Sequence, residues 1–142
     1  MTTIAYKGGI LAADSNCSAG GVRVYQVRKI FRIDDGSLVG FAGDLAEGMK
    51  LVDWLDDGAD EETRPGLQNV HGLVVRPSGR ITLYEQGVPI NPRKPKYIAI
   101  GTGQATAMGA MFWGASAVGA VRAAIEHDDC TRGPVVSMRL KR

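Results

Sequence analysis

The feature that most constrains this chain lies near its start, where two adjacent glycines interrupt an apolar run. The segment TTIAYKGGILAAD places Gly8 and Gly9 between two stretches with the length and composition of short strands. Successive glycines adopt the positive φ angles of a two-residue hairpin turn at little cost, unlike other residues. The first thirteen residues are therefore predicted to form a β-hairpin.

Further strands are predicted where Val, Ile, Phe and Leu cluster between turn residues. These strands are VRVYQVRKIFRID, SLVGFAG, the two arms of VHGLVVRPSGRITLYE about a Ser-Gly turn, KYIAIGTG and PVVSMRL. The segment SNCSAGG is predicted to be a turn, and the polar stretch from Gly58 to Asn69 a loop.

Helices are predicted at three places. Apolar residues recur at helical intervals in DLAEGMKLVDWLDDG, and Asp44 with Glu47 is typical of a capping box at a helix start. Two more helices are predicted from Gln104 to Phe112 and from Ser116 to Ile125. Strands, a helix, more strands and then helices favour an α+β fold, in which antiparallel sheets carry helices on their outer faces.

Composition narrows the class of protein. At 142 residues and 15.1 kDa, the chain is predicted to form one domain over residues 1–142. The 17 Lys and Arg residues against 15 Asp and Glu give a net charge of +2, and their dispersal argues against nucleic acid as a partner. No stretch approaches the roughly 18 apolar residues of a membrane span, so no membrane partner is expected.

The cysteines bear on metal binding and setting. Cys17 and Cys130 lie far apart and lack the spacing of a zinc site, so we expect no metal or cofactor and a reducing, cytoplasmic setting. The start of the chain has no signal-sequence pattern, which predicts an amino terminus at Met1 or Thr2.

Lys29 is the unusual residue of the predicted strand VRKIFRI. Alternation places it on one face with Val27 and Phe31, where a buried ammonium needs a partner because desolvation otherwise favours loss of its proton. Asp14 ends the second strand of the hairpin and could meet Lys29 across neighbouring strands. Two plainer interpretations are that Lys29 extends to water at a sheet edge and that Asp14 forms a turn before Ser15.

Thr2 is a candidate nucleophile. Methionine is usually removed before a small residue, and the α-amine left on Thr2 would titrate near pH 8, so it could act as general base for the adjacent hydroxyl. The positions of His71 and His127 do not suggest a Ser-His-Asp triad. Gly43 separates a strand from a helix start, where its backbone N–H could stabilise an oxyanion or form an ordinary turn.

Together, TTIAYKGGILAADS, VRKIFRI and VGFAGDLAEGMKLVDWL closely resemble the amino-terminal half of proteasome β-type subunits and of the related bacterial peptidase HslV. The resemblance implies the N-terminal nucleophile (Ntn) hydrolase fold, an αββα four-layer sandwich of two antiparallel sheets, and a threonine peptidase mechanism. By position it implies Thr2 as nucleophile and base, Asp14 as orienting carboxylate, Lys29 as the ammonium that tunes the site, and Gly43 as oxyanion donor.

The carboxy-terminal half resembles the family more loosely. AIGTGQATA is similar to the family's small-residue turn before a helix, which implies that Thr102 lies near the amine. HDDCTRG is similar to a supporting loop, which implies Asp128 and Thr131 as hydrogen-bond partners. Thr102 fits the role of a helix cap equally well, and Asp128 that of a solvated helix end.

The resemblance also implies an apolar pocket for the residue that precedes the cut, and so a preference for an apolar side chain there. The residues implied to line it are Val27, Phe31, Phe41, Leu45 and Met49. The same residues are compatible with a purely structural core.

One departure from the family concerns its helices. The family has a second long helix after the first, and here the polar loop from Gly58 to Asn69 takes its place. One helical layer is therefore predicted to be reduced, and the family's ring-to-ring and ATPase contacts cannot be assumed.

These observations predict a proteasome-like threonine peptidase that forms an acyl-enzyme on Thr2 once Met1 is removed. We expect a homo-oligomer, as a ring or stacked rings, because GQATAMGAMFWGASAVGAV offers small residues suited to close packing. Peptides or unfolded proteins are the expected substrates, and the resemblance implies an ATP-dependent unfoldase as a further partner. The alternatives are a proteasome-like assembly protein without catalysis and an Ntn hydrolase of a small amide.

Overall fold

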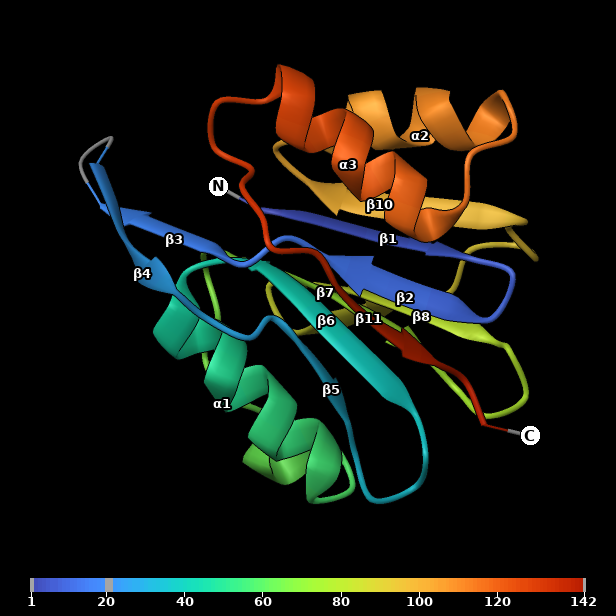
Figure 1. Ribbon diagram of the computed structural model, residues 1–142. Helices are drawn as coiled ribbons and strands as arrows, with labels where there is room; N and C mark the ends of the chain where they lie inside the picture. The colour runs from blue at the N-terminus through green and yellow to red at the C-terminus, as the bar shows by residue number, and fades with distance from the viewer. Residues whose placement is uncertain (1, 20–21, 142) are drawn as a thin grey trace.

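The computed structural model describes residues 2–19 and 22–141, and it arranges them in four layers (Figure 1). A helix covers a five-stranded sheet, this sheet faces a four-stranded sheet, and two helices cover the far side of the second sheet. The predicted αββα sandwich of antiparallel sheets is therefore confirmed. None of the helices within the described residues is long and apolar enough to cross a bilayer.

The four-stranded sheet is built on the amino-terminal hairpin. It has the order β10 (Tyr97–Gly101), β1 (Thr3–Lys7), β2 (Ile10–Ala13) and β11 (Val136–Arg139), with every neighbouring pair antiparallel. Gly8 and Gly9 both have positive φ, 61° and 82°, as the predicted two-residue turn requires.

The five-stranded sheet follows the order of the chain. Its strands are β5 (Ile30–Arg32), β6 (Leu38–Gly43), β7 (Val70–Val75), β8 (Ile81–Glu85) and β9 (Val88–Ile90), each antiparallel to the next. The short edge strand β9 was not predicted, because Pro89 and the exposed side chains around it carry little strand signal.

Two predictions around the second hairpin are wrong. The segment predicted as a turn, SNCSAGG, contains β3 (Asn16–Ala19), which pairs with β4 (Val22–Gln26) in a separate two-stranded sheet. The predicted strand VRVYQVRKIFRID is two strands, β4 and β5, because residues 27–29 leave the hairpin, where the Val27 backbone N–H donates to Ser15 O at 2.9 Å.

The three helices begin close to their predicted starts, and the predicted cap at Asp44 is present. Asp44 caps α1 (Leu45–Asp56) by accepting from the Glu47 backbone N–H at 2.9 Å, and Ser116 caps α3 (Ala117–His127) in the same way. The helix α2 (Gln104–Phe112) starts after Gly103. The Glu47 carboxylate does not complete a capping box but accepts backbone N–H groups of the loop before β7, including that of Asn69 at 3.1 Å.

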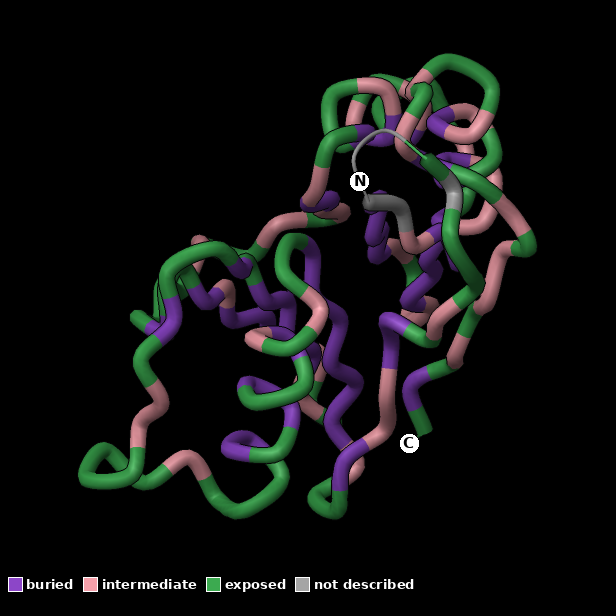
Figure 2. Tube along the Cα trace, turned by 90° about the vertical axis from the view of Figure 1, so that its left-hand side faces the viewer, coloured by how far each residue is buried: buried purple, intermediate pink, exposed green. Residues whose placement is uncertain are grey.

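Three apolar clusters fill the spaces between the layers, and the buried parts of the chain in Figure 2 trace them. One cluster lies between the sheets, one between the five-stranded sheet and α1, and one between the four-stranded sheet and the pair α2 and α3. The loop from Gly58 to Asn69 forms a single 3-10 turn, η1 (Glu61–Thr63), and buries Leu67 against Trp54 and Tyr84. The loop therefore contributes to the core on the α1 side of the five-stranded sheet.

Candidate active site

The predicted site residues converge because four strand ends meet at one end of the sandwich. Thr2 directly precedes β1, Asp14 directly follows β2, Lys29 directly precedes β5, and Gly43 is the last residue of β6. Antiparallel pairing of β1 with β2 brings the first two residues together, and the stacking of the sheets brings the others to the same end (Figure 1). Residues up to 41 positions apart thus share one site.

Lys29 lies between the nucleophile candidate and a carboxylate. Its Nζ donates to Asp14 Oδ1 at 3.0 Å and to Thr2 Oγ1 at 2.8 Å. Lys29 is 5% exposed, Asp14 1% and Thr2 4%. The structure therefore brings together the lysine and the aspartate that strand alternation suggested, although Lys29 itself lies just outside β5.

The Asp14 carboxylate is held by more than the lysine. Oδ1 also accepts the Thr3 backbone N–H at 3.1 Å, while Oδ2 accepts the backbone N–H groups of Asn16 at 3.3 Å and Arg132 at 3.1 Å. These donors come from both halves of the chain. Because all of them are main-chain groups in fixed positions, the carboxylate orients Lys29 rigidly.

Burial changes the acid-base behaviour of the lysine. Desolvation lowers the pKa of Lys29, and the Coulomb attraction and hydrogen bond of Asp14 offset part of this change. The ammonium is consequently a better proton donor than a lysine in water. The group that receives this hydrogen bond is the Thr2 hydroxyl, 2.8 Å away.

A second hydrogen-bonded chain begins at the nitrogen of Thr2. This nitrogen donates to Thr102 Oγ1 at 3.3 Å, and Thr102 Oγ1 donates to Asp128 Oδ2 at 2.7 Å. The Thr131 hydroxyl donates to the same carboxylate oxygen and lies 2.8 Å from Thr3 Oγ1. The chain places all three residues of the looser resemblance beside the start of β1. Met1, which precedes Thr2, lies outside the described residues.

Asp128 is held in its ionised form by these contacts. Partial burial acts to raise the pKa of Asp128, but hydrogen bonds from Thr131 and Thr102 outweigh it, and the pKa lies below its ordinary value. Asp128 is therefore a charged acceptor at neutral pH rather than only a solvated helix end. It also forms the C-cap of α3.

Gly43 occupies a conformation that other residues adopt with strain. Its φ is 118°, and a Cβ at this position would lie 2.1 Å from Asn69 O. The following residue, Asp44, donates its backbone N–H to the same carbonyl at 2.7 Å. The close approach of the β6 end to Asn69 therefore requires glycine, and it leaves Gly43 beside Thr2 on the walls of two cavities.

The larger cavity, of 480 Å³, opens at Thr2 and Lys29 and extends toward the start of α1. Of the predicted pocket residues, Val27, Phe41 and Leu45 line it. The lining residues that sequence reasoning did not identify are Asn16, Cys17, Asp44 and Asn69.

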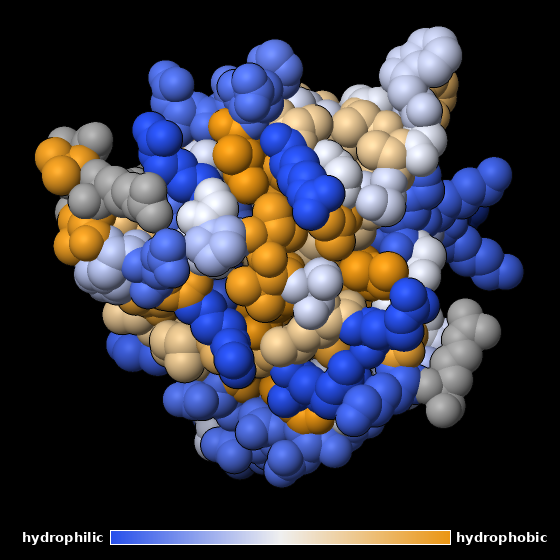
Figure 3. Space-filling view, in the orientation of Figure 1, coloured by the Kyte–Doolittle hydropathy of each residue, from blue (hydrophilic) through white to orange (hydrophobic). Residues whose placement is uncertain are grey.

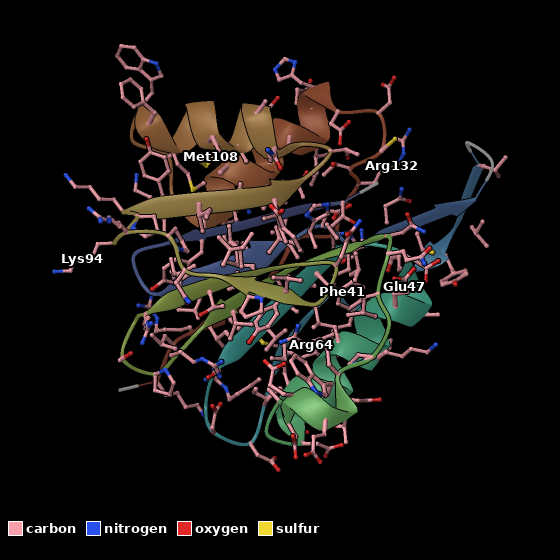
Figure 4. The ribbon with its side chains drawn as sticks, turned by 180° about the vertical axis from the view of Figure 1, so that it is seen from behind. Phe41, Glu47, Arg64, Lys94, Met108 and Arg132 are labelled. Atoms are coloured by element: carbon pink, nitrogen blue, oxygen red, sulfur yellow. The ribbon has the colours of Figure 1, made fainter. Side chains whose placement is uncertain are left out.

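Phe31 and Met49, the other two residues predicted for this pocket, are not among the described residues that line the cavity. The Phe31 ring stacks on the ring of Phe41, which does line the cavity, with centroids 6.3 Å apart. Met49 is 37% exposed, because α1 packs on the sheet through Gly48, Leu51 and Val52 and turns Met49 outward. Figure 4 shows Phe41 beside this helix.

A smaller cavity of 280 Å³ lies on the other side of Thr2 and Gly43. Its further lining includes Ala42, His71, Gly101, Thr102 and Gln104. Strand alternation puts His71 on the same face as Leu73, which packs between the sheets, so this signal could have located it.

Two glycines position the start of β1. A Cβ on Gly101, which has a φ of 101°, would lie 2.0 Å from Thr2 O, and one on Gly103 would lie 2.1 Å from Thr3 Oγ1. The Gly-Thr-Gly sequence around Thr102 therefore serves to bring β1 close to the turn before α2. Sequence reasoning noted this small-residue turn but not the close approach.

Comparisons with known proteins agree with the architecture. The family described as Proteasome subunit matches residues 2–68, just under half of the chain. The structure of HslV from Trypanosoma brucei matches with a TM-score of 0.76 at 21% identity, covering 99% of each chain. The structure of BPH from Thiobacillus denitrificans in complex with epoxomicin matches with a TM-score of 0.69 at 24% identity, again over 99% of each chain. No curated protein sequence matches this chain.

Over 99% of its length, the chain therefore has the fold of the HslV structure. The amino-terminal half carries the sequence pattern of proteasome subunits, and the resemblance stated from the sequence is confirmed.

Proposed function

We propose that this protein is a threonine peptidase of the proteasome and HslV type, which cuts peptide bonds through an acyl-enzyme on Thr2 after removal of Met1. The observation that carries the proposal is the buried contact of Lys29 Nζ with both Thr2 Oγ1 and the Asp14 carboxylate. The Asp14 carboxylate fixes this lysine 2.8 Å from the threonine hydroxyl, and burial lowers the pKa of the lysine. An ammonium held in this position is suited to stabilise an alkoxide on Thr2.

The proposed reaction uses the two groups of one residue. With Met1 removed, the α-amine of Thr2 accepts the proton of its own Oγ1, which attacks the substrate carbonyl carbon. The tetrahedral oxyanion accepts the Gly43 backbone N–H, and Lys29 stabilises the negative charge that develops on Oγ1. The α-ammonium then protonates the leaving amine, and the acyl group remains on Oγ1 as an ester.

Hydrolysis of the ester repeats these steps with water. The α-amine accepts a proton from water, the hydroxide adds to the ester carbonyl, and Oγ1 leaves with the returned proton. The Thr102 hydroxyl accepts from the Thr2 nitrogen and donates to Asp128, so it orients this nitrogen without taking its proton. Thr102 and Asp128 are thus positioning residues in this mechanism.

The larger cavity supports a preference for substrates with an apolar side chain before the cut. Val27, Phe41 and Leu45 form its apolar wall next to Thr2. A volume of 480 Å³ accommodates a leucine or phenylalanine side chain together with its backbone.

We further propose that the enzyme works as a homo-oligomer in the cytoplasm. Large apolar side chains are exposed on β4 and at the end of α2, including Val22, Val24, Phe112 and Trp113. In the view of Figure 3 a band of apolar surface crosses the molecule between hydrophilic flanks. Both features favour burial between subunits. Cys17 and Cys130 are unbonded, in accord with a reducing setting.

Intact-mass spectrometry with an epoxyketone tests the mechanism directly. An epoxyketone carries two adjacent electrophilic carbons, so it reports a hydroxyl and a free amine on the same residue. We expect a mass lower by one methionine, a single adduct, and loss of that adduct in Thr2→Ala but not in Thr63→Ala, a threonine on η1. A retained Met1 with no adduct would instead support a proteasome-like assembly protein without catalysis. Cleavage of small amides without cleavage of apolar fluorogenic peptides would support an Ntn hydrolase of a small amide.

A further inference from the structure

A basic groove lies at the end of the sandwich away from Thr2. It has a volume of 720 Å³ and runs between the β7–β8 turn and the segment that joins β9 to β10. Four cationic side chains line it, those of Arg80, Arg93, Lys94 and Lys96, and no Asp or Glu is among its described lining residues. Figure 4 shows Lys94 extending from the end of the molecule opposite Glu47 and Arg132.

The proposed mechanism does not use this groove. The groove shares none of its lining with the two cavities at Thr2. All four cationic residues are exposed. Like charges gathered in one groove repel one another, so the arrangement favours an anionic occupant.

The same chain also carries a segment of the opposite charge. Residues 53–62, with the sequence DWLDDGADEE, contain six carboxylates and no Lys or Arg. The segment comprises the end of α1 and the start of η1, and Asp53, Asp57 and Glu62 are exposed.

The two surfaces lie on different parts of one molecule. The acidic segment lies in the helical layer on the five-stranded sheet, whereas the groove lies at the end of the sheets (Figures 1 and 4). A contact between two different surfaces of identical chains is heterologous, and repetition of it generates a ring when the rotation closes.

We propose that the basic groove of one subunit binds the acidic segment, residues 53–62, of a second copy of this chain. The inference rests on the proposed homo-oligomer and adds which surfaces meet within it, and it does not depend on peptidase activity. Because the contact joins exposed charges, it weakens as salt rises and the screening length falls to about 3 Å at 1 M.

Charge reversal with exchange tests this contact. We would determine the mass in solution, by light scattering after size exclusion at about 0.1 M salt, of three variants. The first carries Arg80→Glu and Lys96→Glu in the groove, and the second carries Asp53→Lys and Asp57→Lys in the acidic segment. The third, called the fourfold exchange, carries all four substitutions. Arg122→Glu with Lys50→Glu, two exposed cations on helices, reverses the same charge outside the groove and serves as the matched control.

The wild type is expected at a multiple of 15.1 kDa, as are the control and the fourfold exchange, while both double variants shift toward 15.1 kDa. A monomeric wild type, double variants that keep the wild-type mass, or a fourfold exchange that fails to reassemble would each overturn the inference. Adduct formation on Thr2 is measured separately, so failure of the peptidase proposal is distinguishable from failure of this one.

Discussion

The two ends of the sandwich differ in how they hold charge. At the end with Thr2, Lys29 and Asp14 are almost completely buried and are saturated by hydrogen bonds. At the opposite end, the cations of the basic groove are exposed, and no carboxylate lines the groove among the described residues.

This difference indicates where each group of charges acts. Burial without a partner is costly, so a buried lysine is retained only with groups of the same chain around it, and its chemistry acts within that site. Exposed cations contribute little to folding, so their concentration in one groove points to a partner outside the molecule. Single substitutions at the end with Thr2 should therefore lower the stability of the fold. Single substitutions in the basic groove should leave it nearly unchanged.

Replacing the buried lysine should have the largest effect. Lys29→Met leaves the Asp14 carboxylate buried without its ammonium, and we expect a loss of about 3–5 kcal/mol in the free energy of unfolding. We also expect at least about a 100-fold loss in the rate of epoxyketone adduct formation. Urea denaturation and timed mass spectrometry measure the two effects, with the exposed Lys50→Met as control. A variant as stable as the wild type would show that Asp14 needs no ammonium.

Gly43→Ala should have the next largest effect. Its φ of 118° and the 2.1 Å approach of a Cβ to Asn69 O force the end of β6 to move. We expect a loss of about 1–3 kcal/mol in the free energy of unfolding. We also expect a slower adduct rate, because the proposed oxyanion donor moves with the backbone. Gly66→Ala is the control, since a Cβ there meets nothing within 4 Å. Equal stability of the two variants would contradict the steric argument.

Thr131→Val removes one hydroxyl from the buried network with little change in shape. We expect a cost of about 1–3 kcal/mol at neutral pH, because Asp128 and Thr3 each lose a hydrogen-bond partner. Because the folded-state pKa of Asp128 lies below its unfolded value, the stability it contributes is present above about pH 4 and is lost as pH falls through the lowered value. The difference between wild type and variant, followed by urea denaturation from pH 7 to pH 2.5, should therefore shrink in acid. A difference that stays constant would exclude this role for Asp128.

A smaller effect is expected on the alkaline side. The pKa of Lys29 is lower in the folded state than in the unfolded chain, so between these two values the unfolded chain binds more protons. The contribution of this residue to stability must then rise with pH up to the unfolded pKa of about 10.4. Subtracting the alkaline stability curve of Lys29→Met from that of the wild type isolates this rise. A flat difference would mean that burial does not lower the pKa of the lysine.

The opposite end of the molecule should give the smallest effect. Arg93→Gln removes an exposed cation from a groove of like charge, and we expect the free energy of unfolding to change by no more than about 0.5 kcal/mol. Adduct formation on Thr2 should be unchanged. Denaturation at high salt measures the stability of the chain without the proposed subunit contact. A loss comparable to that of Gly43→Ala would remove the distinction between the two ends.

Local patterns predicted the elements whose signals lie within a few residues. The Gly8-Gly9 turn and the cap at Asp44 are correct because a positive φ or a side-chain cap is a local requirement. The strand β3 and the break at residues 27–29 were missed because the partner strand, rather than local composition, decides them.

Within the candidate site, residue types in the sequence identified the groups of the proposed chemistry: a threonine that follows the initial methionine, and a lysine whose apolar neighbours require a carboxylate partner. The tertiary structure alone decided that Arg132 and Asn16 hold that carboxylate, that Thr131 reaches Thr3, and that Phe31 and Met49 stay off the cavity wall. The reason is physical. Residue type fixes the charge and reactivity of a side chain, whereas distances between strand ends depend on how two sheets and their helices pack.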